Sequence, residues 1–182
     1  MNKTVKKTVL SAMFIAIGQV LPFVTGQIPE IGNMLLPMHV PVMLCGLICG
    51  AQYGAAVGFI TPLLRSVVFL RPVMFPNAVA MAFELATYGF VIGIIYLILK
   101  KRGVLSVYIS LAASMLAGRA VWGGVMALLL MNGKGFTLSA FVAGAFATAL
   151  PGIVIQLLLI PAVMLVLSRT GLVRFGGRSD DK

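Results

Sequence analysis

Chemistry in this sequence can come only from a few polar side chains that stand inside apolar segments. The stretch Leu36–Tyr96 holds the single histidine, His39, and the single acidic residue embedded in an apolar segment, Glu84. Arg65 lies in the same stretch, and Arg119 stands near the middle of a later apolar segment. Ionisable groups at membrane depth are costly, so they usually face a partner or a cavity. We expect the function to depend on these residues.

Their side-chain types favour binding of a polar solute over catalysis. A guanidinium suits a carboxylate or phosphate, which it can hold through two parallel hydrogen bonds. Two embedded arginines against one glutamate leave a positive balance, which favours an anionic substrate. The sequence has no nucleotide-binding fingerprint, metal-ligand motif or nucleophile–base pair. We therefore expect no enzymatic activity, cofactor or metal.

Each of these residues also has a structural interpretation that the sequence leaves open. Arg65 lies about one turn below the outer boundary, where a long basic side chain can extend to the interface. Glu84 could form a purely structural ion pair with Arg65 or Arg119. His39, at the start of its segment, could be a hydrogen-bonded helix cap, and Gln156 could serve only an interhelical hydrogen bond.

Composition places these residues in a membrane protein. Hydrophobic residues make up 60% of the chain and charged residues 10%, with a mean hydropathy of +1.09. A soluble domain of 182 residues cannot hide that much apolar surface. The formal charge of +10 comes mainly from clusters at 3–7, 100–102 and 169–182, at the ends of apolar segments. This is the positive-inside pattern of membrane proteins, not a groove for nucleic acid.

Six apolar segments predict an all-α integral membrane protein, a compact bundle of six transmembrane helices with both termini cytoplasmic. The segments are residues 7–24, 39–50, 53–69, 76–99, 104–131 and 139–167. We expect a single domain over residues 1–182, with cytoplasmic tails at 1–6 and 169–182. We expect external loops at 25–38 and 70–76, and the first, with 14 residues, is long enough to serve as a lid or binding segment.

Helical spacing adds further candidate residues. Asn77, Glu84 and Tyr88 fall on one predicted face of the fourth segment. Trp122 lies one turn outward from Arg119 on the fifth segment and offers a flat apolar wall with an indole donor.

Ala12 and Ala16 form a small-residue pair four positions apart in the first segment. Such a pair lets another helix approach closely. The approaching helix could belong to this chain or to a partner subunit.

The central stretch resembles a known family. The segments LPMHVPVMLCGLICGAQYGAAVGFITPLLRS and RPVMFPNAVAMAFELATYGFVIGIIY are similar to the substrate-binding S components of energy-coupling factor (ECF) vitamin transporters. Chain length, six predicted helices and the alanine pair extend the resemblance over nearly the whole sequence. It implies a multi-pass protein of the bacterial plasma membrane that captures a water-soluble vitamin from outside and covers it with the loops 25–38 and 70–76. The resemblance also implies docking through Ala12 and Ala16 on a membrane-embedded T subunit, which works with two cytoplasmic ATPases.

Residue chemistry and resemblance together predict a vitamin site, with pantothenate as the best candidate. Pyridoxine, a pyrimidine precursor, folate and cobalamin remain open. Other classes would be a membrane scaffold that binds no small molecule, or a stand-alone secondary carrier. The expected substrate-binding residues are Arg65, Asn77, Glu84, Tyr88, Arg119, Trp122, His39 and Phe75.

Overall fold

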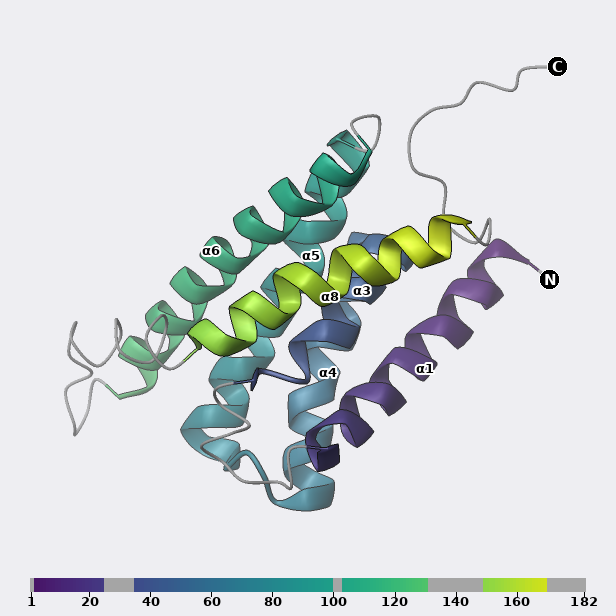
Figure 1. The fold of residues 1–182 in the computed structure, drawn as a ribbon. Coiled ribbons are helices and arrows are strands. Elements are labelled where there is room, and N and C mark those ends of the chain that lie inside the picture. Colours follow the sequence, from purple (N-terminus) through teal and green to yellow (C-terminus); the bar gives the residue numbers. More distant parts are fainter. Residues whose placement is uncertain (1, 25–34, 100–102, 131–148, 170–182) are drawn as a thin grey trace, which may run out of the picture.

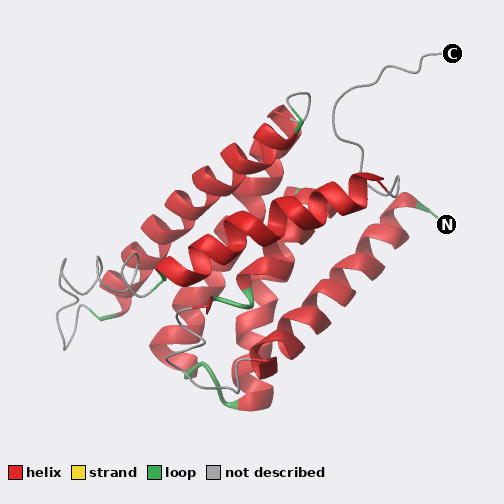
Figure 2. Ribbon diagram, viewed as in Figure 1, coloured by secondary structure: helices red, strands yellow, loops and turns green. Residues whose placement is uncertain are grey.

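The structure is a computed structural model that describes residues 2–24, 35–99, 103–130 and 149–169. Within these ranges every regular element is a helix (Figure 2), so the expected all-α fold is confirmed. Among the described residues, six helices correspond to the six expected segments, and a short helical segment, η1, precedes the fourth of the six. Labelled as in Figure 1, they are α1 (Lys3–Val24), α3 (His39–Cys49), α4 (Ala51–Phe69), η1 (Met74–Ala78), α5 (Val79–Leu99), α6 (Val104–Leu129) and α8 (Leu150–Arg169).

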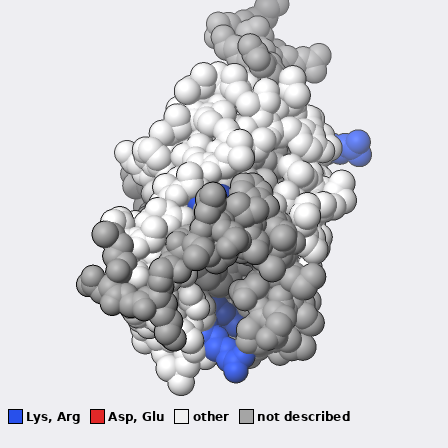
Figure 3. All heavy atoms as spheres, turned by 90° about the vertical axis from the view of Figure 1, so that its left-hand side faces the viewer, with Lys and Arg blue, Asp and Glu red and all other residues white. Residues whose placement is uncertain are grey.

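In the part of the chain that the structure describes, four stretches are long and apolar enough to cross a membrane: α1, η1 with α5, α6, and α8. Helix α3 is apolar but has only 11 residues. Much of the described surface is uncharged on the face shown in Figure 3. Large apolar side chains stand exposed on these helices, for example Leu97, Leu116 and Leu158. Such an outward surface suits lipid, because hydrocarbon rather than water is the favourable neighbour of these side chains.

Helix α5 is the central element of the bundle and packs against α3, α4 and α6. Helix α1 stands at the edge (Figure 1), where it contacts α3 and α4 and leaves most of its surface exposed. The start of α1, the end of α5, the start of α6 and the end of α8 all lie toward the upper part of Figure 1. The described helices therefore alternate in direction, as a bundle with neighbouring ends requires.

Glycines set the closest contacts of the bundle. A Cβ on Gly89 of α5 would overlap the backbone of Gly54 on α4, and one on Gly54 would lie 2.6 Å from the Gly89 carbonyl oxygen. Only residues without a side chain allow α4 and α5 to approach this closely. Gly50, with a φ of +101°, is the single residue between the end of α3 and the start of α4. Helix α4 therefore begins at Ala51 rather than near residue 53.

Several predicted boundaries differ from the structure. Helix α1 starts at Lys3, inside the predicted tail 1–6, because the Asn2 side chain accepts a hydrogen bond from the Thr4 amide at 3.4 Å and caps it. The predicted segment 76–99 becomes η1 followed by α5, because Phe75 is extended (φ −118°, ψ 131°) and Pro76 lacks an amide donor. Residues 25–34, 131–148 and 170–182, parts of the predicted loops, last segments and tail, lie outside the described residues.

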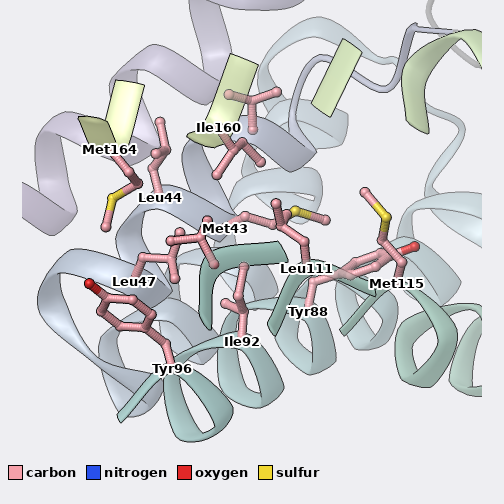
Figure 4. Packing of buried hydrophobic residues seen from close by; sticks show 12 residues of the cluster. Met43, Leu44, Leu47, Tyr88, Ile92, Tyr96, Leu111, Met115, Ile160 and Met164 are labelled. Atoms are coloured by element: carbon pink, nitrogen blue, oxygen red, sulfur yellow. The ribbon is translucent and has the colours of Figure 1, made fainter. Parts of the chain in front are cut away.

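The apolar core lies where four helices meet (Figure 4). Its large side chains are buried against one another and come from α3, α5, α6 and α8. They include Met43, Leu47, Tyr88, Ile92, Leu111, Met115, Ile160 and Met164. This core supports the polar residues that lie one turn further along the same helix faces.

Candidate ligand-binding site

Three buried ionisable residues from three helices meet directly beside the core. Arg119 Nη1 of α6 lies 2.9 Å from Glu84 Oε1 of α5, and His39 Nε2 of α3 lies 3.7 Å from the same oxygen. Glu84 is 2% exposed and His39 is 1% exposed. An unpaired carboxylate at such a position would be strongly destabilising, and the guanidinium compensates it. We call Glu84, Arg119 and His39 the Glu84 cluster.

Helix register places the three residues together. Each lies four residues, about one turn, from a core residue and therefore shares that residue's helix face. Helix α6 runs antiparallel to α3 and α5. Moving four residues toward the C-terminus of α6 therefore corresponds to moving four residues toward the N-terminus of α3 or α5. The pairs are His39 with Met43, Glu84 with Tyr88, and Arg119 with Met115.

Several atoms of the Glu84 cluster lack hydrogen-bond partners among the described residues. Arg119 Nε and Nη2 and both ring nitrogens of His39 are buried and have no hydrogen-bond partner among the described residues. Glu84 Oε1 is in ionic contact with Arg119, but that contact lacks the alignment of a hydrogen bond. Because buried polar atoms are normally hydrogen-bonded, these are the atoms that a ligand would satisfy. The Tyr88 ring packs edge-on against His39, with centroids 5.1 Å apart, and limits the imidazole's freedom.

Arg65 lies in a different environment, and its described partners do not include Glu84. Its Nη1 donates to the carbonyl oxygen of Gln19 on α1 at 2.6 Å. Its guanidinium packs against the rings of Phe23 and Phe69, 5.3 and 5.0 Å from the centroids. We call Arg65, Gln19, Phe23 and Phe69 the Arg65 cluster. It joins α1 to α4, and these contacts favour a structural role for Arg65 without testing its expected role in substrate binding.

The remaining predicted residues of the site lie on α5, α6 or η1. Tyr88 is buried in the core, whereas Trp122 on α6 is half-buried. Phe75, 58% exposed, and Asn77 belong to η1 at the outer end of α5. Regular helix begins only at Val79, so the predicted shared face extends through Glu84 and Tyr88 but not to Asn77.

The segment that carries Phe75 is anchored from α4. Ser66 Oγ donates to the Pro72 carbonyl oxygen at 2.7 Å. This bond ties residues 70–76, one of the two predicted covering loops, to the helix that precedes them.

Ala12 and Ala16 both face outward from α1. Larger apolar residues of the same helix, Met13, Ile17 and Val20, are also exposed. The described helices of this chain therefore leave the alanine pair uncovered, which favours the partner-subunit interpretation over packing within the protein.

Sequence reasoning did not include Gln156 among the expected site residues. Its side chain on α8 is 1% exposed, and its Nε2 has no hydrogen-bond partner among the described residues. A usable signal exists in the sequence, because Gln156 is the only amide side chain in the last apolar segment.

The fold and the polar core agree with a family match over most of the chain. The family model for "ECF transporter, substrate-specific component" matches residues 6–167. The chain belongs to this family. The resemblance seen in the sequence is thus confirmed, and this S component is a membrane transport subunit of a family that is not enzymatic. No curated protein and no solved structure matches the chain.

Proposed function

We propose that this S component captures a water-soluble vitamin or vitamin precursor from outside a bacterial cell and binds its polar end at the Glu84 cluster. The observation that carries the proposal is the set of unpartnered atoms on Arg119 and His39, buried in a protein of a substrate-binding family. Keeping such atoms buried and unsatisfied costs about 1–3 kcal/mol for each group. A binding function explains that cost, whereas a scaffold would have no use for it.

The contacts of the two arginines remove net positive charge as the reason for expecting an anionic substrate. Arg65 is engaged by α1, so the Glu84 cluster contains one guanidinium and one carboxylate, with no positive excess. Preference for a carboxylate then depends on the free donors of Arg119 rather than on net charge. Pantothenate suits such a site, because it carries one carboxylate together with amide and hydroxyl groups. Pyridoxine, a pyrimidine precursor, folate and cobalamin are the competing candidates.

The surrounding residues support a covered site with a separate docking surface. Tyr88 and Trp122 would form its walls, and Asn77 and Phe75 would contact the ligand from the outer side. The segments 25–38 and 70–76 would cover the bound vitamin. The outward face of α1 at Ala12 and Ala16 would dock on a membrane-embedded T subunit, which two cytoplasmic ATPases drive.

A binding screen tests the proposal. The detergent-purified chain is heated with each water-soluble vitamin and precursor, and every ligand that raises the melting temperature is titrated by calorimetry. A ligand at 1,000-fold over its Kd adds about 4 kcal/mol of stability by mass action. We expect one clear ligand, whose stabilising effect is reduced in Arg119→Lys.

The matched control is Thr87→Ala on the same helix as Glu84. Thr87 Oγ1 donates only to the Phe83 carbonyl oxygen of its own helix, so this variant should bind like the wild type. A folded protein that no vitamin stabilises would contradict the proposal and favour the scaffold.

A further inference from the structure

Gln156 and Gln19 are both glutamines of apolar helices, yet their amides are used differently. Gln19 Nε2 of α1 donates to the Thr61 carbonyl oxygen at 3.0 Å and joins α1 to α4, while its acceptor Oε1 is buried without a hydrogen-bond partner among the described residues. Gln156 Nε2 of α8 is buried without a hydrogen-bond partner among the described residues. The interhelical hydrogen bond expected at Gln156 therefore does not explain this amide nitrogen.

Helix register places Gln156 at the level of the Glu84 cluster. Ile160, four residues further along α8, belongs to the same core cluster as Met43, Tyr88 and Met115, and Figure 4 shows these side chains converging. Gln156 thus lies one turn outward from the core on α8, as His39, Glu84 and Arg119 do on their helices. Helix α8 also packs against α3 and α6, which carry His39 and Arg119.

On the same helix faces, the side chains become small one turn further outward from the polar residues. One turn further outward from Glu84, Arg119 and Gln156 the residues are Ala80, Gly123 and Gly152, all buried. Below the polar level the corresponding positions carry large apolar side chains. Counted outward from the core, the helices therefore present a layer of large apolar side chains, then the polar layer, then a layer of small residues. This order suits a ligand whose polar end points toward the core.

We infer that Gln156 is a fourth ligand-contacting residue and that the polar layer accepts a neutral or singly negative, acceptor-rich group such as a carboxylate or carboxamide. This inference rests on the proposed function and specifies its substrate. Three unpartnered atoms are obligate donors: Arg119 Nε, Arg119 Nη2 and Gln156 Nε2. Among the described residues of this layer, Glu84 Oε1 is the one obligate acceptor without a hydrogen bond, and an imidazole such as that of His39 supplies one donor and one acceptor when it is neutral.

Charge sets the second limit on the ligand. The formal charges of Arg119 and Glu84 cancel, so a dianionic phosphate ester would bring an excess of negative charge into a buried layer. A cation would meet donors rather than acceptors. A single carboxylate or carboxamide satisfies the free donors and leaves a hydroxyl or amide hydrogen of the ligand for Glu84.

The test compares Gln156→Met with Gln19→Met in the full-length, detergent-purified chain. Thermal unfolding is measured without ligand and with pantothenate, pyridoxine, orotate, folate, cobalamin and, as the cationic probe, thiamine. Gln156→Met should melt no lower than the wild type, because the amide nitrogen that it removes is buried without a partner among the described residues, while the side-chain volume is nearly conserved. It should bind the stabilising vitamin about tenfold more weakly or worse, as loss of a buried hydrogen bond predicts.

Gln19→Met should show the opposite pattern, with a lower melting temperature and unchanged vitamin affinity. If a vitamin stabilises the wild type and Gln156→Met to the same extent, the inference is overturned and the proposed function stays intact. A drop in melting temperature for Gln156→Met without ligand would also overturn it, since it would identify a structural hydrogen bond. Preference for thiamine would overturn the ligand class, and a wild type stabilised by no probe would refute the proposed function and this inference together.

Discussion

The Arg65 cluster and the Glu84 cluster each bury an arginine among helices, but they use the guanidinium in different ways. Arg65 donates to a backbone carbonyl of α1 and lies against two aromatic rings. Arg119 forms one ionic contact with Glu84 and keeps Nε and Nη2 without partners among the described residues. The first arginine joins two helices, whereas the second retains the capacity to bind something else.

Hydrogen bonding of the guanidinium distinguishes the helix-joining arginine from the proposed ligand-binding arginine more clearly than burial or charge does. Both arginines are nearly fully buried, and both stand in apolar segments. What distinguishes them is that Arg119 has buried donors, Nε and Nη2, without partners among the described residues, whereas no atom of Arg65 is in that condition. A buried donor left unsatisfied by the fold indicates a site whose partner is a ligand.

The largest effect should come from removing the guanidinium of the Glu84 cluster. Arg119→Met leaves Glu84 buried and uncompensated, which should lower the free energy of unfolding by about 3–5 kcal/mol. The double variant Glu84→Leu with Arg119→Met should recover most of that loss but not vitamin binding, because buried ion pairs can be replaced by apolar residues. Thermal unfolding in detergent measures both. Wild-type stability in Arg119→Met would show that the pair is not buried as described.

A smaller loss is expected in the Arg65 cluster. Arg65→Ala removes a charged hydrogen bond to the Gln19 carbonyl oxygen and two ring contacts, together about 2–3 kcal/mol. Because these contacts hold α1 to α4, hydrogen exchange should increase in the outer half of α1 and stay unchanged in α5. Uniform exchange across the bundle would contradict the assignment of Arg65 to this connection.

A single hydrogen bond beside Arg65 gives the next prediction. Ser66→Ala removes the bond from Ser66 Oγ to the Pro72 carbonyl oxygen and should cost about 1 kcal/mol. If residues 70–76 cover the site, the dissociation rate of the vitamin should rise while the contacts at Glu84 persist. Stopped-flow release of the vitamin measures this rate, and Thr87→Ala is the control. An unchanged rate would remove this segment from the proposed cover.

The smallest effect on the isolated protein is expected on the opposite face of α1. Ala16→Leu adds an exposed apolar side chain, so stability and vitamin affinity should stay within experimental error of the wild type. Co-purification with the T subunit should fall strongly, because the larger side chain blocks close helix approach. Val20→Leu, also exposed on α1, is the matched control. Intact assembly in Ala16→Leu would exclude the alanine pair from the docking surface.

The sequence predicted the helical fold well because lipid imposes a simple rule on apolar segments. It also identified Glu84 and Arg119 as a possible pair, since charges at membrane depth need compensation. It could not decide which arginine pairs with Glu84, because that choice depends on how α1, α4 and α6 pack around α5. Gln156 was missed for the same reason: its unsatisfied amide becomes visible only when the neighbours of α8 are known.

The most direct test of the central claim is to titrate the stabilising vitamin against Arg119→Lys and Arg65→Lys in parallel. Each variant keeps the positive charge and loses the planar guanidinium. The structure predicts that affinity falls by about 10- to 100-fold in Arg119→Lys, the equivalent of one or two charged hydrogen bonds. Affinity in Arg65→Lys should stay close to that of the wild type. Equal losses in both variants, or a loss confined to Arg65→Lys, would contradict the division of roles between the two arginines.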